Sequence, residues 1–344
     1  MRKLSYMSFI IAPLCALLLI GCNSDSNIEK SSDLSASFSV ERNKTDKVYT
    51  LNIEGDGHWE VFAGEIPDSI DTNTVIIEGN GTKEVNLTQF PSNKRIYFQY
   101  ILENSIKIIA SERLLPMQGA YNVRDIGGYK TVDGKTVKWG KVFRSGDLNQ
   151  LTNTDIAYLE NIGIRTVVDF RDSIEKLAAP DSSLSTVINR LEYPIETGSI
   201  VVLAQTAEEN KQVLIDANKV FVTDFQDEYK KFFEALMNEN NLPLLFHCSA
   251  GKDRAGFAAA MFLSALGVDK ETIIQDYLLS GIYVEEKYAS YVSLAPHLAP
   301  VFTVYREYIE AAFDTIDKEY GGIDSYLSNE LGVDLELMRA IYTK

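Results

Sequence analysis

The sequence predicts two domains of different class: an all-β sandwich, followed by an α/β domain in which helices flank a central sheet. Two observations lead to this division. Short runs of β-branched and aromatic residues, separated by Gly, Asn, Asp and Pro, fill residues 35–115. From residue 116 to 344, apolar strand-like runs alternate with segments of helical periodicity. A chain of 344 residues is long enough to build two hydrophobic cores.

Composition narrows the classes of partner. Apolar residues make up 45% of the chain and charged residues 24%, which is ordinary for a globular protein. The formal net charge is −16. An acidic surface argues against nucleic acid or anionic lipid as a general partner. An anionic substrate would therefore have to be attracted by a local cluster of Arg and Lys.

The N-terminus predicts export. Arg2 and Lys3 precede an apolar stretch, Phe9–Ile20, that is too short to span a bilayer comfortably. The following Gly21-Cys22 resembles a bacterial lipoprotein signal, which implies a signal peptide over 1–21, lipidation of Cys22 and a polar tether over 22–34. The alternative is an ordinary secretory signal with an incidental cysteine. We expect an extracytoplasmic protein held to the membrane of the cell envelope by lipid, in the outer membrane if the bacterium has two.

The cysteine count supports a functional thiol. Cys15 would leave with the signal and Cys22 would be acylated, so we expect Cys248 to remain as the only free thiol of the exported chain. A lone thiol in an oxidising compartment is at risk of oxidation, and its presence favours a functional role.

Seven short runs predict the strands of the first domain. Their spacing of about ten residues is typical of an immunoglobulin or fibronectin sandwich. Trp59 and His58 could line a groove, but a tryptophan within a strand is more often part of the core. We interpret this domain as a spacer, or as a module that docks another protein or an envelope component. The runs are 38–40, 48–53, 58–62, 74–78, 83–87, 95–102 and 106–114.

The second domain carries the chemistry. A helix is predicted over 152–161 with Thr152 or Asn153 as its N-cap, and a strand over 164–171. Ligand groups in open α/β sheets lie at the carboxyl ends of strands, which is where this strand carries Asp169 and Arg171. Residues 205–236 are predicted to form a helical lid over a pocket.

The run HCSAGKDR, residues 247–254, is the most informative segment. It lies between a predicted strand over 242–246 and an apolar helix over 255–263. A loop in this position presents backbone N–H groups and the positive end of a helix, and so it can bind an oxyanion. The same donors and Arg254 would stabilise a thiolate at Cys248, which makes it a candidate nucleophile. The alternative is that Cys248 is a buried structural thiol.

This run resembles the phosphate-binding loop of protein tyrosine phosphatases. Together with three other motifs in the same order, it resembles the bacterial tyrosine phosphatase family that includes mycobacterial PtpB and Listeria LipA. The likeness covers about residues 117–344 and leaves the β domain outside it. It implies a tyrosine-phosphatase-like fold and hydrolysis of phosphotyrosine, with phosphoserine, phosphothreonine or phosphoinositides as further substrates. The other motifs are NVRDIGG at 122–128, FRSGDL at 143–148 and VVDFRD at 167–172.

Residue chemistry gives each loop residue a role. Cys248 would attack phosphorus, and Arg254 would grip two phosphate oxygens in a bidentate fork. Backbone N–H groups would bind the remaining oxygen, and His247 would orient the loop from behind. The candidate substrate-binding residues are His247, Ser249, Ala250, Gly251, Lys252 and Arg171.

Two aspartates compete as general acid. The resemblance places the family's catalytic aspartate at Asp169, and Asp253 within the loop is the rival. A strand-end aspartate also serves as a cap, and Arg171 could pair with an acid only to hold loops together. Asp172 and Asp181 are weaker candidates.

Two loop positions bear on substrate and rate. Lys252 resembles a lysine of phosphatases that accept phosphoinositides, although it could instead be solvated at the rim. Ala255 departs from the resembled family, which has Thr or Ser after the arginine, so this chain lacks the hydroxyl that helps the cysteine sulfur leave the phosphoenzyme.

Other functions stay open. One is a non-catalytic phosphate-binding lipoprotein, and another is an extracytoplasmic phosphatase of inositol phosphates or sugar phosphates. A rhodanese-like sulfur transferase would also use a loop cysteine, but the Lys-Asp-Arg end of the loop fits phosphate better. The three histidines are scattered at 58, 247 and 297, so we expect no metal site and no cofactor.

Overall fold

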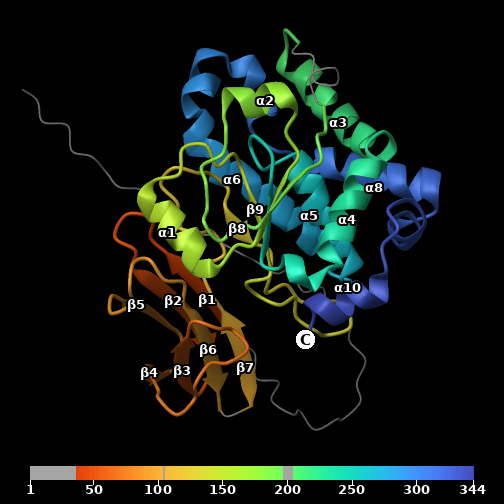
Figure 1. Cartoon of the computed structure of the whole chain (residues 1–344). Helices are drawn as coiled ribbons and strands as arrows, with labels where there is room; N and C mark the ends of the chain where they lie inside the picture. Colours follow the sequence, from red (N-terminus) through yellow and green to blue (C-terminus); the bar gives the residue numbers. More distant parts are fainter. Residues whose placement is uncertain (1–35, 104, 197–203) are drawn as a thin grey trace, which may run out of the picture. The chain divides into compact units, whose positions relative to one another are not determined.

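The computed structural model describes residues 36–103, 105–196 and 204–344 (Figure 1). The predicted signal peptide and tether lie outside the described residues. Residues 35–344 belong to one compact unit, and the boundary predicted at 115/116 stays a prediction. Within the described ranges no helix is both long and apolar enough to cross a membrane.

Two antiparallel sheets make up the N-terminal part. Their strand orders are β1-β2-β5 and β4-β3-β6-β7, and side chains from both sheets share one apolar cluster. Trp59 is fully buried in that cluster and its indole N–H donates to the carbonyl of Gly81 (2.8 Å), so the core interpretation is confirmed. All seven predicted strands are present, while the immunoglobulin or fibronectin type stays a prediction. The strands are β1 Ala36–Arg42, β2 Tyr49–Gly55, β3 His58–Gly64, β4 Ile77–Asn80, β5 Lys83–Leu87, β6 Tyr97–Leu102 and β7 Ile106–Ala110.

A five-stranded sheet forms the centre of the second part, in the order β11-β10-β12-β9-β8. Four strands run parallel, and β8 pairs antiparallel at one edge. The register aligns Asp169, His247 and Ser145, the last residues of β10, β12 and β9. The carboxyl ends of these strands therefore meet at one edge of the sheet, where a ligand site is expected. The strands are β8 Arg124–Asp125, β9 Val142–Ser145, β10 Thr166–Asp169, β11 Asn189–Glu192 and β12 Leu244–His247.

Helices surround this sheet, as Figure 1 shows. The predicted α/β class, with helices flanking a central sheet, is thereby confirmed. Helix α5 is the most central helix, because every one of its residues from Arg254 to Ala265 is buried. The helices are α1 Asn153–Ile162, α2 Ser173–Ala178, α3 Ala207–Thr223, α4 Gln226–Leu236, α5 Arg254–Ala265, α6 Lys270–Leu294, α7 Ala299–Phe302, α8 Arg306–Tyr320, α9 Ile323–Ser325 and α10 Leu335–Tyr342, with single turns at Glu239–Asn241, Pro296–Leu298 and Tyr326–Glu330.

Local signals explain where several helices begin. Thr152 caps α1 in a capping box with Asp155, so the predicted start of that helix is confirmed. Asp172 caps α2 in the same way, with Glu175 as the reciprocal partner. This capping box sets the start of α2 at Ser173, shortly after β10 ends at Asp169.

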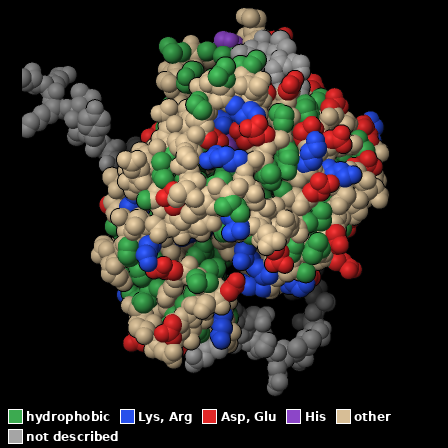
Figure 2. Space-filling view, viewed as in Figure 1, with side chains coloured by type: hydrophobic (Ala, Val, Ile, Leu, Met, Phe, Trp, Pro, Cys, Tyr) green, Lys and Arg blue, Asp and Glu red, His purple; other side chains and the backbone are tan. Residues whose placement is uncertain are grey.

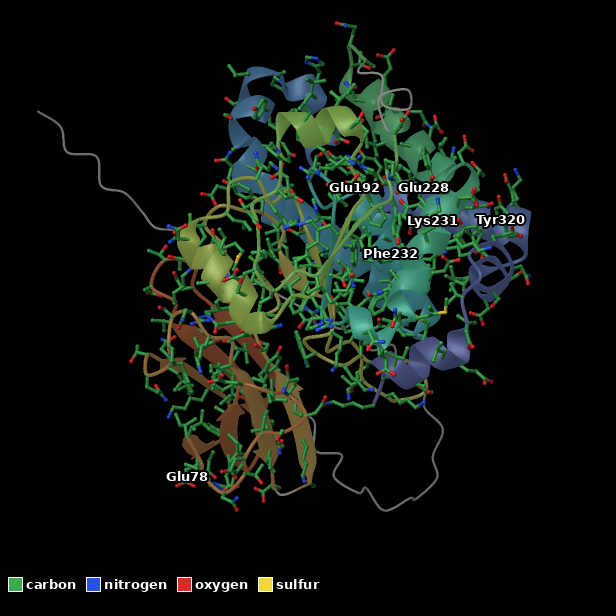
Figure 3. All side chains as sticks on the ribbon, viewed as in Figure 1. Glu78, Glu192, Glu228, Lys231, Phe232 and Tyr320 are labelled. Atoms are coloured by element: carbon green, nitrogen blue, oxygen red, sulfur yellow. The ribbon has the colours of Figure 1, made fainter. Side chains whose placement is uncertain are left out.

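The segment predicted as a lid consists of two helices with different roles. Helix α3 contributes side chains to the pocket described below, whereas α4 packs into the core. Phe232, labelled in Figure 3, packs edge-on against Phe170 directly after β10 (5.4 Å) and Phe246 of β12 (4.9 Å). Lys231 beside it is exposed. Only the first half of the predicted lid therefore lies where a lid could act.

Buried polar contacts connect the β sheets to the α/β part. Arg95 donates to the buried carboxylate of Asp125 (2.6 Å). Arg42 donates to the hydroxyl of Tyr158 on α1 (3.1 Å). The outer surface differs from this interior: Figure 2 shows acidic and basic side chains mixed over the face that carries α3, α4 and α8. The buried contacts of Arg95 and Arg42 thus attach the β sheets to the α/β part.

Candidate active site

The loop Cys248–Arg254 joins the end of β12 to the start of α5, as the sequence predicted. Gly251 has a φ of +69°, and a Cβ at this position would lie 2.4 Å from the backbone oxygen of Ser145. Only glycine fits a backbone that turns left-handed this close to a neighbouring strand. The tight turn brings the backbone N–H of Gly251 to 3.3 Å from the sulfur of Cys248. At least one backbone N–H of the loop therefore points at the cysteine sulfur.

A pocket of about 190 Å³ opens over the loop. Its polar floor contains Cys248, Lys252, Asp253 and Arg254. Its walls are mainly apolar and come from helices far apart in the sequence. The wall residues are Leu214, Ala217 and Phe221 of α3, Tyr288 of α6, and Val301 and Phe302 of α7.

Arg254 is held by a carboxylate that the sequence analysis did not single out. Its Nη1 and Nη2 atoms donate to the two oxygens of Glu175, each over 2.7 Å, and Ser249 donates to the same carboxylate. Burial would raise the pKa of Glu175, but the hydrogen bonds and charge of Arg254, with the bond from Ser249, outweigh it and lower that pKa to about 2. Glu175 is therefore ionised at neutral pH.

The two candidate acids lie in different surroundings. Asp253 lines the pocket with Cys248, and its carboxylate pairs with Lys252 (2.8 Å). Asp169 is absent from the pocket lining, and its oxygens accept from the guanidinium of Arg171 (2.8 and 3.0 Å). Of the two, only Asp253 is placed beside the nucleophile.

A buried ionic cluster lies behind the loop. Arg171 joins Asp169 to Asp181, and His247 lies 3.0 Å from Asp181 through Nε2. The other ring nitrogen of His247 lies 3.4 Å from the carbonyl of Cys248, which suits the predicted orienting role. Burial would raise the pKa of Asp181, but His247 and Arg171 lower it. Arg171 therefore contacts acids, and it is not among the residues that line the pocket.

Within residues 36–103, 105–196 and 204–344, two groups of side chains have metal-ligand composition. Asp169, Asp181 and His247 have ligand atoms within 4.8 Å of one another, but the Arg171 guanidinium already pairs with both carboxylates. That pairing fits an ion-pair cluster better than a cation site. The second group, His58, Glu60 and Glu78, lies on the β3–β4 pair, with its two glutamates directly opposite in register (Figure 3 labels Glu78).

Lys252, two arginines and Ala255 are all buried near the loop. Lys252 is 3% exposed and lies within the loop, so it is not a solvated rim residue. Arg124 is fully buried and pairs with Asp276 on α6 (3.2 Å), and Arg144 pairs with the same carboxylate (2.9 Å). Ala255 is fully buried in the first turn of α5.

Several site residues lacked a sufficient signal in the sequence. Glu175 is part of a capping box that can be recognised from its spacing to Asp172, but its contact with Arg254 depends on packing. Lys287 of α6 donates to the carbonyl of Ser249 (2.9 Å), and nothing in its local sequence indicates this. The pocket walls on α6 and α7 were missed for the same reason.

Comparison with known proteins assigns the second part of the chain. Residues 115–344 match the model of the tyrosine phosphatase family. A protein of Cupriavidus necator named as a tyrosine-protein phosphatase is 32% identical over 237 residues, covering 64% of this chain and 85% of the relative. The triple specificity protein phosphatase PtpB of Mycobacterium tuberculosis is 30% identical over 259 residues, covering 61% and 91%. A crystal structure of TpbA from P. aeruginosa with phosphotyrosine aligns at a TM-score of 0.29 and 15% identity, covering 60% of this chain and 88% of TpbA.

Proposed function

The chain belongs to the tyrosine phosphatase family, and from this premise we propose that it hydrolyses phosphate monoesters through a cysteinyl-phosphate on Cys248. One observation carries the proposal. Cys248, Arg254 and Asp253 line a single pocket over a loop that already directs one backbone N–H at the sulfur of Cys248. A nucleophile, an anion-binding group and an acid are thus adjacent.

In the first step the sulfur of Cys248 attacks phosphorus. An S–P bond forms while the bond between phosphorus and the leaving oxygen breaks, and Asp253 gives its proton to that oxygen. Loop N–H groups and Arg254 stabilise the charge on the phosphate oxygens in the transition state. Both aspartates pair with a cation, and we choose Asp253 over Asp169 because only Asp253 lines the pocket with Cys248.

In the second step water attacks the cysteinyl-phosphate. The carboxylate of Asp253 takes a proton from that water, an O–P bond forms, the S–P bond breaks, and inorganic phosphate leaves with the thiolate regenerated. Ala255 supplies no hydroxyl at the start of α5, so we propose that this step is slower than in relatives with Thr or Ser there.

Arg254 retains a free edge for the substrate. Of its five N–H donors, those on Nη1 face Glu175, Phe170 and Ile195, and one on Nη2 faces Glu175. Among the described residues, Nε and the second Nη2 donor have no hydrogen-bond partner. These two donors form a parallel pair, which is the geometry for bidentate binding of a phosphate.

We propose phosphotyrosine as the preferred substrate. Apolar and aromatic side chains wall the pocket, with the rings of Tyr288 and Phe302 stacked 4.9 Å apart, and they suit an aryl group attached to the phosphate. The Mycobacterium tuberculosis relative is named for triple specificity, and Lys252 is a further cation beside the nucleophile. Phosphoserine, phosphothreonine and phosphoinositides therefore belong in the test, as do inositol and sugar phosphates.

We also propose that the enzyme is exported and lipid-anchored through Cys22, outside the cytoplasm. The basic start, the apolar stretch and Gly21-Cys22 support this. The β sheets follow Cys22 in the sequence and precede the catalytic part, and we propose that they dock an envelope component. In a bacterial host, Cys22→Ala should abolish incorporation of labelled palmitate; retained incorporation would contradict the proposal.

The direct test is Cys248→Ser. We expect it to abolish turnover of an aryl phosphate and of phosphotyrosine peptides while circular dichroism and thermal unfolding stay close to wild type. Retained turnover would exclude the mechanism. A panel of phosphotyrosine, phosphoserine, phosphoinositide and inositol phosphate substrates then ranks specificity by kcat/KM.

A further inference from the structure

The backbone carbonyls of the loop are held from outside. The carbonyl of Ser249 accepts from Lys287 (2.9 Å), and that of Ala250 accepts from the Asn122 amide (3.2 Å). The carbonyl of Gly251 accepts from the same amide (2.9 Å) and from Arg144 (2.7 Å). Three consecutive carbonyls therefore bind side chains from β9, from α6 and from the bend before β8.

Holding these carbonyls also orients the N–H groups of the loop. In a planar trans peptide the C=O and the following N–H point in opposite directions. Carbonyls 249 to 251 that point outward therefore turn the N–H groups of residues 250 to 252 inward. The N–H of Gly251 shows this directly, because it lies 3.3 Å from the sulfur of Cys248.

We propose that Asn122, Arg144 and Lys287 are positioning residues that set the oxyanion-binding N–H groups of the loop. This inference rests on the proposed function, since it assigns those N–H groups to the phosphate of the substrate. None of the three side chains needs to touch the substrate for this role. Each one acts through a backbone carbonyl of the loop.

Asn122 is built for two contacts at once. It is 1% exposed and its φ of +60° lies in the left-handed region, which asparagine adopts more readily than most residues. Its amide oxygen accepts from Arg124, which leaves the amide nitrogen facing the two loop carbonyls. The orientation of the Asn122 amide is thus fixed at both ends.

Arg144 adds charge to the same contact. Arg124 and Arg144 share the single carboxylate of Asp276, so these three buried groups carry one net positive charge behind the loop. Burial, and next the charge of Arg124, lower the pKa of Arg144 to about 10, which still leaves it protonated at neutral pH. The positive charge of Arg144 at the Gly251 carbonyl favours an anion in the pocket.

Lys287 completes the set from α6. Its Nζ atom lies 2.9 Å from both the Ser249 carbonyl and the carboxylate of Asp147, and its side chain is 20% exposed. Because it is the least buried of the three, its substitution is the least disruptive to folding.

The decisive variant is Asn122→Gly, since glycine keeps the left-handed backbone and removes the side chain that contacts the two loop carbonyls and Arg124. Tungstate binding to the full chain, measured by calorimetry, should weaken at least tenfold, and kcat on an aryl phosphate should fall roughly 10²-fold, as when an oxyanion donor is lost. Alkylation of Cys248 by iodoacetate at neutral pH should also slow.

The matched control is Asn241→Gly, because Asn241 is buried and donates to a carbonyl of α4 (2.8 Å) away from the loop. The control should lose stability without a change in tungstate affinity.

The outcomes separate the inference from the proposed function. Wild-type tungstate affinity and wild-type alkylation in a folded Asn122→Gly variant would overturn the inference. If that variant does not fold, Lys287→Met replaces it: weaker tungstate binding with partial recovery in Lys287→Arg supports the inference, and unchanged binding overturns it. If the wild-type chain binds tungstate but hydrolyses no phosphate ester, the proposed function fails while the binding test still decides the role of Asn122.

Discussion

Arg254 and Glu175 face each other along two parallel hydrogen bonds, each 2.7 Å long. A bidentate pair of this kind fixes the plane of the guanidinium as well as its position. The contact comes from α2, whose start is set by the capping box of Asp172. The arginine that we propose binds phosphate is therefore oriented by a helix that follows the neighbouring strand of the sheet.

The first prediction concerns this pair. Glu175→Gln should lower kcat/KM on an aryl phosphate roughly tenfold, because a hydrogen bond to a charged group contributes about 1.5–3 kcal/mol and the amide retains part of it. Steady-state kinetics checks this. The control is Glu192→Gln. Glu192, labelled in Figure 3, is exposed and pairs with Lys176, which lies beside Glu175 on α2. We expect the control to match wild type, and equal losses in both variants would contradict a specific role.

The pair also gives a pH dependence with a defined sign. The pKa of Glu175 falls from its usual 4.5 to about 2, so its contribution to stability is complete above the unfolded value and is lost as the pH falls toward 2. The difference in Tm between wild type and Glu175→Gln should therefore be constant at neutral pH and shrink in acid. A difference independent of pH would show that the ion pair does not stabilise the fold.

The second prediction separates the two aspartates. Asp253→Asn should reduce kcat by about 10²-fold or more on an ester with a poor leaving group, and less on a good one, because general acid catalysis matters most for poor leaving groups. Asp169→Asn should mainly lower Tm, since it removes a carboxylate paired with the buried Arg171. A larger kinetic loss in Asp169→Asn would return the acid role to that residue. Equal small losses would exclude both.

The sequence could predict the parts of the site that depend on local pattern. The loop between β12 and α5 was predicted because strand, glycine turn and helix are adjacent in the chain. The start of α1 was predicted for the same reason, since Thr152 and Asp155 form a box within one turn. The seven strands of the β sheets follow from alternation and turn residues, with β7 ending at Ala110 instead of Leu114.

Contacts between distant segments could not be predicted from pattern. Glu175 and Arg254 are separated by 79 positions, and their pairing depends on how α2 packs beside the loop. Asp169 and Asp253 both had the right chemistry, and only packing placed one of them in the pocket. Residues 205–236 have helical periodicity throughout, but that pattern does not reveal that α4 turns Phe232 into the core.

The third prediction concerns Ala255. Ala255→Ser introduces a hydroxyl directly after the loop arginine, so it should speed breakdown of the proposed cysteinyl-phosphate. In rapid-mixing experiments with an aryl phosphate, the steady-state rate should rise and the initial burst should shrink. An unchanged burst and steady state would show that the missing hydroxyl does not limit turnover.

The fourth prediction tests the attachment of the β sheets. Arg95→Met removes the 2.6 Å ion pair to the fully buried Asp125, which should cost about 3 kcal/mol of unfolding free energy, since a buried charge loses its partner. Chemical denaturation measures this. The neighbouring Lys94→Met breaks only an exposed pair with Glu65 and should change stability by less than about 1 kcal/mol. Similar losses of unfolding free energy in both variants would show that the buried Asp125 carboxylate does not need Arg95 as its partner.

The measurement that tests the central claim most directly is capture of the phosphoenzyme. Enzyme and aryl phosphate are mixed rapidly, quenched in acid, digested, and analysed by peptide mass spectrometry. We predict a phosphate on the sulfur of Cys248, formed at least as fast as steady-state turnover. Phosphate on another residue, or full turnover without any modified Cys248 peptide, would contradict the mechanism.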